Sequence, residues 1–218
     1  MIRATLRARA ASGLACAALV GCRAPSGPIR GAAPAVSHPP SGQPEARQLI
    51  SAWIAAQSPG AEHRRLDPLV GQWDLAGWWK PAAPADAPRT ELSGRVDASW
   101  ILDRRFLEAR FEGDTVGIPY GGLQLLGYDR LTGRYQLIAL ESTTTAVNHF
   151  EGQLDQTTGT IVFTGTIADP AVSGSYRGVL ELHAGRHTFR GFLLKPDGSQ
   201  VQVSEYIYTP RSVQPRSR

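Results

Sequence analysis

Cysteine is scarce in this chain. Its 218 residues include only Cys16 and Cys22, and both lie near the start. No thiol remains after Cys22 to form a disulfide or a thiolate zinc site. The folded part of the chain is therefore predicted to contain neither.

A surplus of charge is also missing. The chain has 23 basic and 19 acidic residues, but Arg3, Arg7 and Arg9 lie in a segment that we expect to be removed. Subtracting these three from 23 leaves 20 basic residues against 19 acidic ones. A near-neutral protein lacks the concentrated basic face that nucleic-acid binding needs, so no nucleic-acid partner is predicted.

The start of the chain has the pattern of an export signal. Met1–Arg9 carries three arginines and no acidic residue, and Ala10–Gly21 is a short run of small and apolar residues. The run is too short to cross a membrane as a helix, but it is typical of a secretory signal peptide, predicted here over residues 1–21. Its end, Leu19-Val20-Gly21-Cys22, resembles the lipobox of bacterial lipoproteins.

The lipobox resemblance implies that cleavage leaves Cys22 as the first residue, carrying lipid on its thiol. Two or more acyl chains anchor a protein stably to a bilayer, so the membrane is a predicted partner and the cell envelope the predicted location. The next residue is Arg23 and not Asp, which favours the outer membrane facing the periplasm if the source is Gram-negative. The alternative is an ordinary signal peptide with a chance cysteine.

A proline-rich tether and a helix are predicted next. Residues 22–44 include six prolines among Gly, Ala and Ser, a composition that favours a disordered spacer. In residues 45–60, apolar side chains recur at helical spacing, as at Ile50, Trp53 and Ile54. This helix could lie on the membrane surface, but with one basic residue it more simply packs over the barrel. Residues 210–218 are predicted to form a disordered tail.

The body of the chain, residues 66–209, has the alternation of antiparallel strands. In Arg105–Glu112, for example, Leu107, Ala109 and Phe111 occupy one face, and Phe106, Glu108 and Arg110 the other. Ten such runs are separated by turn-forming residues: Gln72–Lys80, Arg95–Ile101, Arg105–Glu112, Gly122–Tyr128, Arg134–Glu141, Thr144–Glu151, Thr160–Ile167, Ser175–His183, Arg186–Leu194 and Gln200–Tyr208.

Evenly spaced short strands favour an all-β fold. We predict an antiparallel meander that closes into a lipocalin-like barrel of about eight to ten strands, with one N-terminal helix. Closure removes the exposed edges that such a long sheet would otherwise have. Two of the turns, Asp129–Gly133 and Asp155–Gly159, share the pattern Asp-x-x-Thr-Gly, which turn geometry alone can enforce.

Several short motifs resemble an uncharacterised bacterial family, domain of unknown function 1579, whose members are lipocalin-like barrels. The motifs are Leu69-Val70-Gly71-Gln72-Trp73, Trp100-Ile101-Leu102, Arg105-Phe106-Leu107, Gly122, Leu126-Gly127-Tyr128-Asp129, Thr132-Gly133 and Tyr135. The resemblance covers about Leu66 to Tyr208 and implies a barrel fold. It implies no activity, so no catalytic residue is assigned.

A barrel of this size can enclose a small apolar ligand or fill itself with side chains. The aromatic candidates for a ligand site are Trp73, Trp100, Phe106, Tyr128, Tyr135 and Tyr206. Glu108 and Arg110 would orient a polar ligand group if their face were interior. An exterior position, with Leu107, Ala109 and Phe111 pointing inward, is the simpler expectation.

The histidines and hydroxyls give no catalytic or metal pattern. If Ala184-Gly185 is a two-residue hairpin loop, His183 and His187 point to opposite faces, so no metal site is predicted. His149 could be a buried polar residue, a haem ligand or a surface residue, and no local pattern favours haem; no cofactor is predicted. The hydroxyl run Ser142–Thr145 beside Glu141 lacks a nucleophile elbow.

Three functions remain open from the sequence. A cavity of a few hundred Å³ lined by aromatic and a few polar groups would favour an envelope protein that binds a small hydrophobic or amphipathic ligand. A filled interior would favour a structural or interaction domain. A carboxylate or histidine in the cavity with a shifted pKa would favour a hydrolase or isomerase acting in the barrel mouth.

Overall fold

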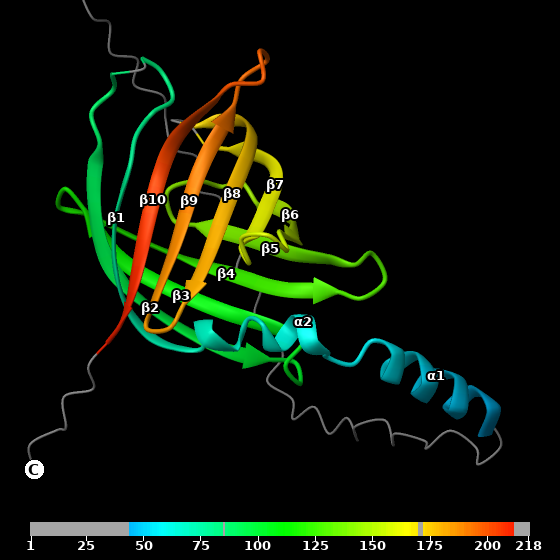
Figure 1. Ribbon diagram of the computed structural model, residues 1–218. Coiled ribbons are helices and arrows are strands. Elements are labelled where there is room, and N and C mark those ends of the chain that lie inside the picture. Colours follow the sequence, from blue (N-terminus) through cyan, green and yellow to red (C-terminus); the bar gives the residue numbers. More distant parts are fainter. Residues whose placement is uncertain (1–43, 85, 170–171, 212–218) are drawn as a thin grey trace, which may run out of the picture. The chain divides into compact units, whose positions relative to one another are not determined.

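The computed structural model describes residues 44–84, 86–169 and 172–211. Ten antiparallel strands pair in sequence order, and β1 also pairs with β10, so the sheet closes into a barrel (Figure 1). The predicted fold class is confirmed. The strands are β1 (Gly71–Trp79), β2 (Thr90–Ile101), β3 (Phe106–Thr115), β4 (Ile118–Asp129), β5 (Arg134–Glu141), β6 (Asn148–Leu154), β7 (Ile161–Ala168), β8 (Ser173–His183), β9 (Arg186–Leu194) and β10 (Gln200–Pro210).

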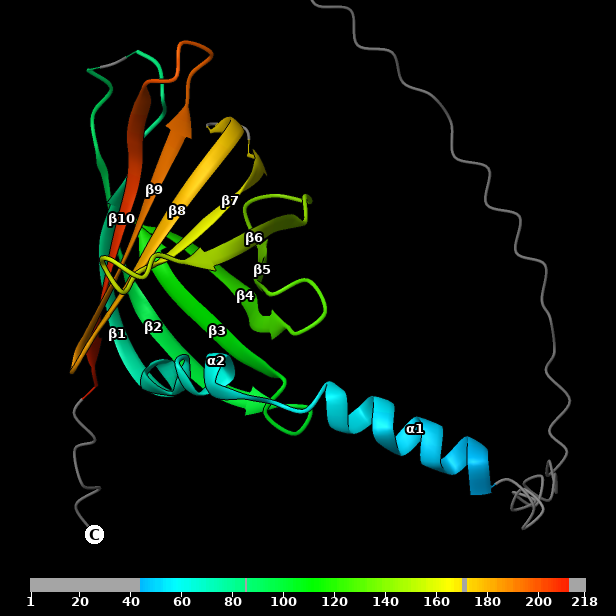
Figure 2. The same ribbon diagram turned by 45° about the vertical axis from the view of Figure 1, so that its right-hand side comes forward.

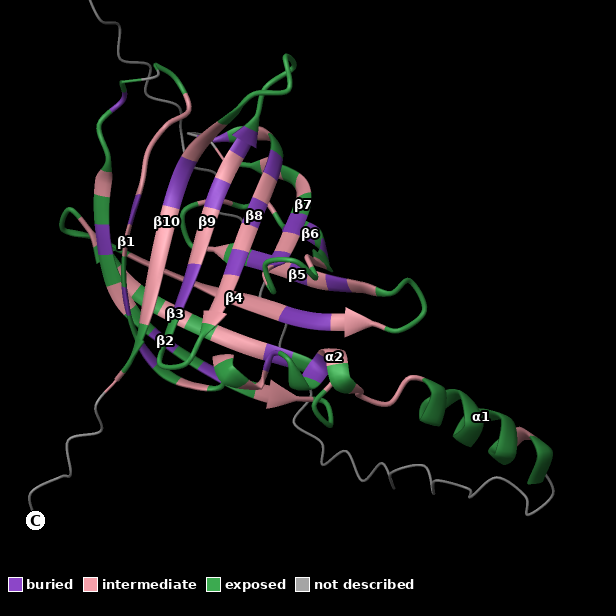
Figure 3. Cartoon of the chain, in the orientation of Figure 1, coloured by how far each residue is buried: buried purple, intermediate pink, exposed green. Residues whose placement is uncertain are grey.

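The alternation along the strands decides which side chains face the interior. In β3, Leu107 is 2% exposed and Phe106 is 39% exposed, so the Leu107 face points inward as the simpler expectation had it. Glu108 and Arg110 form an ion pair on the outer face. Buried and less buried positions also alternate along β2, β5, β6 and β8 (Figure 3). The interior is therefore built from every second residue of the sheet.

The two Asp-x-x-Thr-Gly turns have the same construction. Asp129 accepts a hydrogen bond from the Leu131 backbone N–H, and Asp155 accepts one from Thr157. Each turn ends on a glycine with positive φ, 68° at Gly133 and 72° at Gly159. Only glycine adopts this conformation without strain, so turn geometry accounts for the shared pattern.

A short helical segment seals one end of the barrel. It consists of α2 (Ala61–Arg64) and the 3₁₀ helix η1 (Asp67–Leu69), and we call residues 61–70 the plug. Figures 1 and 2 place α2 at the barrel end where β2 finishes and β3 begins. Leu66 of the plug is completely buried in the core. The Trp73 indole donates a hydrogen bond to the Leu69 carbonyl at 2.9 Å. These contacts tie the plug to the barrel wall.

Helix α1 (Pro44–Ala56) differs from the preferred prediction. None of its residues is buried, and Leu49, Ile50, Trp53 and Ile54 are exposed. The interpretation of a helix packed over the barrel was therefore wrong, because its apolar face meets no core residues. Among the described residues, no helix is both long and apolar enough to cross a membrane.

The predicted boundaries of one strand and of the C-terminal tail differ from those in the structure. The predicted strand Thr144–Glu151 is in fact Asn148–Leu154, and residues 142–147 form a loop. Strand β10 includes Pro210, the first residue of the predicted tail. The predicted signal peptide, Cys22 and the tether up to residue 43 lie outside the described residues, as do residues 212–218.

Candidate ligand-binding cavity

A cavity of about 350 Å³ lies inside the barrel and is partly open to solvent. Its walls come from the whole sheet, because all ten strands, β1 to β10, contribute side chains. Apolar and aromatic groups dominate, including Leu75, Phe111, Phe150, Phe189 and Tyr206. The volume and the lining are typical of small-molecule sites.

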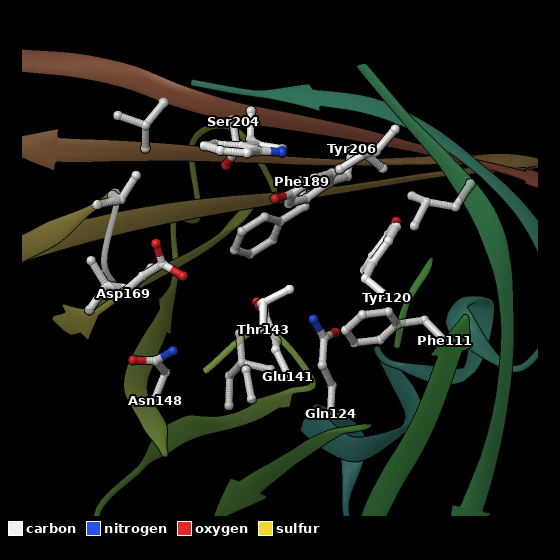
Figure 4. Close-up of a pocket in the computed structure, with 18 of the residues that line it drawn as sticks. Phe111, Tyr120, Gln124, Glu141, Thr143, Asn148, Asp169, Phe189, Ser204 and Tyr206 are labelled. Carbon is white, nitrogen blue, oxygen red and sulfur yellow. The ribbon is translucent and has the colours of Figure 1, made fainter. Parts of the chain in front are cut away.

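The polar groups of the cavity gather at the end of the barrel away from the plug. Glu141 is the last residue of β5, and Asp169 directly follows β7. Thr143 and Asn148 border the same space. Figure 4 shows these four residues on one side of the cavity and Phe111, Tyr120, Phe189 and Tyr206 on the other. The site therefore has an acidic, polar side facing an aromatic one.

Burial makes Glu141 an unusual carboxylate. Its withdrawal from solvent raises the pKa of the Glu141 carboxyl, and the negative charge of Asp169 raises the pKa further. A hydrogen bond with the Thr143 hydroxyl opposes the shift. The carboxyl is therefore more easily protonated than a surface glutamate.

Four tyrosines lie within the electrostatic reach of Glu141. Burial, followed by the charge of Glu141, raises the pKa of Tyr120 to about 12. Burial is also the main cause of the raised pKa values of Tyr176, Tyr206 and Tyr208, with Glu141 adding to each. All four phenols are therefore neutral hydrogen-bonding groups at physiological pH.

The Tyr120 hydroxyl stands apart from the other polar groups. Its oxygen is buried and has no hydrogen-bond partner among the described residues. An unsatisfied buried hydroxyl costs free energy, about 1–3 kcal/mol, which a ligand can recover by bonding to it. Tyr120 therefore marks a point where the cavity offers a hydrogen bond.

A second, smaller cavity of about 70 Å³ lies toward the plug. It shares wall residues with the larger one, among them Gln124, Phe189 and Tyr208. His187 lines it, is 1% exposed, and bonds through Nε2 to the Pro68 carbonyl at 2.9 Å. Because a carbonyl only accepts, Nε2 carries the proton, and the buried Nδ1, which has no partner in the described part of the chain, is an acceptor.

The six aromatic residues singled out from the sequence lie in four different places. Tyr206 lines the larger cavity and Trp73 the smaller one. Trp100, Tyr128 and Tyr135 line neither. They contact the plug: the Trp100 indole donates to Asp67, and the Tyr128 ring lies 6.0 Å from that of His63. Phe106 is on the outer face of β3 and is exposed.

Sequence reasoning missed the polar side of the cavity. Glu141 and Asp169 end strands at the same barrel end, but they are 28 positions apart (169 − 141), so no local motif joins them. A signal did exist at Glu141. It alternates in phase with Tyr135, Leu137 and Ala139, which form an apolar face of β5. Continuing that face by one step places Glu141 inside the barrel.

The histidines occupy the positions that the hairpin geometry predicts. His183 pairs with Arg186 and His187 pairs with Leu182, so their rings point to opposite faces. His149 is exposed on the outer face, where its ring contacts the Gln136 amide within hydrogen-bonding distance. Within the described ranges, no three His, Cys, Asp or Glu side chains gather closely enough to hold a metal ion.

Comparison with known protein families assigns the chain to one of them. A family model described as protein of unknown function (DUF1579) matches residues 58–209. The chain belongs to the DUF1579 family. No curated protein sequence matches this DUF1579 protein.

Solved structures similar to this DUF1579 protein are distant in sequence. Rv2717c from M. tuberculosis is 14% identical, has a TM-score of 0.53, and covers 70% of this chain and 99% of its own. The S-type phycobiliprotein lyase CPES from Guillardia theta is 14% identical, with a TM-score of 0.47, and covers 74% of this chain and 98% of its own. At this identity, the first similarity establishes the fold and nothing more.

Proposed function

We propose that this DUF1579 protein binds a small amphipathic molecule inside its barrel. The observation that carries the proposal is the cavity of about 350 Å³, with aromatic walls and a few polar groups on one side. A second supporting feature is the buried Tyr120 hydroxyl, which has no hydrogen-bond partner in the described part of the chain and which a ligand would satisfy. A structural domain with a filled core would have neither.

The direct test is native mass spectrometry of the protein purified gently from its own cell envelope. A bound small molecule is expected as a defined mass increment that is lost on denaturation. The matched variants are Ala139→Leu, which adds bulk to the cavity wall, and Thr166→Leu, which adds the same side chain at an exposed position of β7. Only Ala139→Leu should abolish the increment, and an increment that survives it would contradict the proposal.

A second candidate function has one specific observation in its favour. The raised pKa of Glu141 beside neutral tyrosine hydroxyls suits proton transfer, with the carboxylate as base and a phenol as hydrogen-bond donor to developing negative charge. An isomerase of this kind would exchange a ligand's acidic C–H with deuterium from D₂O. Mass spectrometry of the recovered native ligand would detect the exchange, and Glu141→Gln should abolish it.

We further propose that Cys22 anchors the protein to the cell envelope, on the outer membrane facing the periplasm if the source is Gram-negative. The support is the signal-like segment over residues 1–21 and its lipobox-like end. Cys22→Ser should release the protein from the membrane fraction or leave it unprocessed, whereas Cys16→Ser should change neither. A processed Cys22→Ser protein that stays in the membrane fraction would contradict the anchor.

A further inference from the structure

The charges that line the large cavity are all of one sign. Glu141 and Asp169 contribute carboxylates, and among the described residues on its walls there is no lysine, arginine or histidine. Arg190, for example, pairs with Glu181 and Glu205 and does not line the cavity. No described basic side chain lies within ion-pair distance of Glu141. Its charge is therefore balanced by none of the protein's own cations that the structure places.

An anionic ligand does not suit such a site. A fatty acid or a phosphate placed beside Glu141 would add negative charge next to a carboxylate that burial already disfavours. A positively charged group has the opposite effect, because it favours the ionised carboxylate that burial disfavours. The electrostatics of the cavity therefore distinguish ligands by the sign of their head group.

The opposite side of the cavity suits the same kind of ligand. Phe111, Tyr120, Phe189 and Tyr206 face the acidic side across the cavity (Figure 4). Aromatic faces attract cations and also accept alkyl chains. Leu75, Val96 and Leu137 extend the apolar wall. Val96 and Leu137 also line the smaller cavity. A ligand with a charged nitrogen and an apolar body would therefore be complementary to both the acidic side and the aromatic side of the cavity.

We infer that the ligand is an amphipathic amine, whose ammonium group lies against Glu141 in the field of Asp169 and whose apolar part lies among the aromatic side chains. This inference rests on the proposed function, because it names the class of ligand for the same cavity. A bare metal ion would use the carboxylates but leave the apolar wall unfilled. The acidic groups and the aromatic wall together therefore favour an organic cation.

Three probes with the same tail and different heads test the inference: octylamine, octanol and octanoate. They are titrated calorimetrically into the full chain held in lipid nanodiscs, with titrations of empty nanodiscs subtracted. Octylamine is expected to bind roughly tenfold or more tightly than octanol, and octanoate more weakly than octanol. Calcium ions should not displace octylamine, since an ion that did so would identify the site as a metal site.

Substitutions attribute the preference to the named carboxylates. Glu141→Gln should lower octylamine affinity roughly tenfold and leave octanol affinity unchanged, and Asp169→Asn should have a smaller effect in the same direction. Glu151→Gln removes the same charge from the exposed face of β6 and should change neither. Circular dichroism confirms that each variant is folded.

The outcomes separate the inference from the proposed function. Equal binding of octylamine and octanol, or tighter binding of octanoate, would overturn the inference while leaving a ligand-binding barrel in place. A preference for octylamine that survives both Glu141→Gln and Asp169→Asn would also overturn it. Binding of none of the three probes would count against the proposed function itself.

Discussion

Glu141 ends β5 with its carboxyl inside the barrel, and this position is unfavourable for the stability of the fold. Burial and the charge of Asp169 both oppose its ionisation. The folded protein therefore holds a proton on Glu141 more tightly than the unfolded chain does. By linkage, the contribution of this group to the free energy of unfolding falls as the pH rises above its ordinary pKa of 4.5.

Replacing Glu141 by Gln should therefore stabilise the protein at neutral pH, because the amide has no charge to bury. The gain should shrink as the pH falls and disappear below about pH 4, where the carboxyl is protonated in both states. Thermal unfolding of the two proteins across this pH range measures the difference. Glu151→Gln on the outer face is the control, and a gain that is independent of pH would contradict the explanation.

How far single residues could be predicted depends on how local their signal is. The inward face of β3 followed from alternation, and so did the opposite orientations of His183 and His187. The pairing of Glu141 with Asp169 in one cavity could not be predicted. It depends on how many strands close the barrel and on their stagger, which no local pattern encodes.

The plug and α1 are both short helical segments before β1, but they contribute differently to the fold. The plug contributes Leu66 to the core and accepts hydrogen bonds from Trp73 and His187. Helix α1 contributes no buried residue. Helical periodicity predicted α1, but periodicity says only that a helix has an apolar face, not what covers that face.

Two tryptophan substitutions should show that the contacts of the plug contribute to stability and that α1 does not. Trp73→Ala should lower the free energy of unfolding by about 3–5 kcal/mol, because it leaves a hole in the wall and removes the bond to Leu69. Trp53→Ala in α1, where the side chain is 64% exposed, should change it by less than about 0.5 kcal/mol. Urea unfolding of both variants provides the comparison. A large effect of Trp53→Ala would mean that α1 is packed in solution.

The strands were predicted well in number and order, and less well at their ends. Ten runs were expected and ten strands are found, since period-two patterning and turn residues are strong signals. Strand β6 was placed too early. The hydroxyl-rich residues at 142–147 have strand-like composition, but they form the loop beside the cavity mouth. Composition does not distinguish a strand from an extended loop that a binding site requires.

The molecule as a whole depends on the seam between β1 and β10. Seven residue pairs join these strands, from Trp73 with Pro210 to Trp79 with Ser204. Without the seam, both strands would present unpaired edges and the cavity would lose a wall, since Leu75 and Tyr206 come from opposite sides of it. Gly77 lies within the seam. A Cβ atom added there would meet the Glu205 carbonyl oxygen at 2.3 Å.

Gly77→Val should therefore open or distort the seam, at a cost of about 1–3 kcal/mol in the free energy of unfolding. Ligand binding should weaken as well, because the cavity wall shifts. The matched control is Ala76→Val, which adds bulk at the exposed neighbouring position and should be tolerated. Denaturant unfolding and titration with octanol measure the two effects. Equal behaviour of the two variants would show that the seam tolerates a side chain.

The seam also affects how the chain folds during synthesis. Its two strands are the first and the last of the barrel, so β1 emerges from the ribosome long before its partner exists. During synthesis, the early strands form at best an open half-barrel whose apolar inner surface faces water. Such an intermediate is prone to aggregate. The protein should therefore depend on a chaperone until its final strand has been delivered.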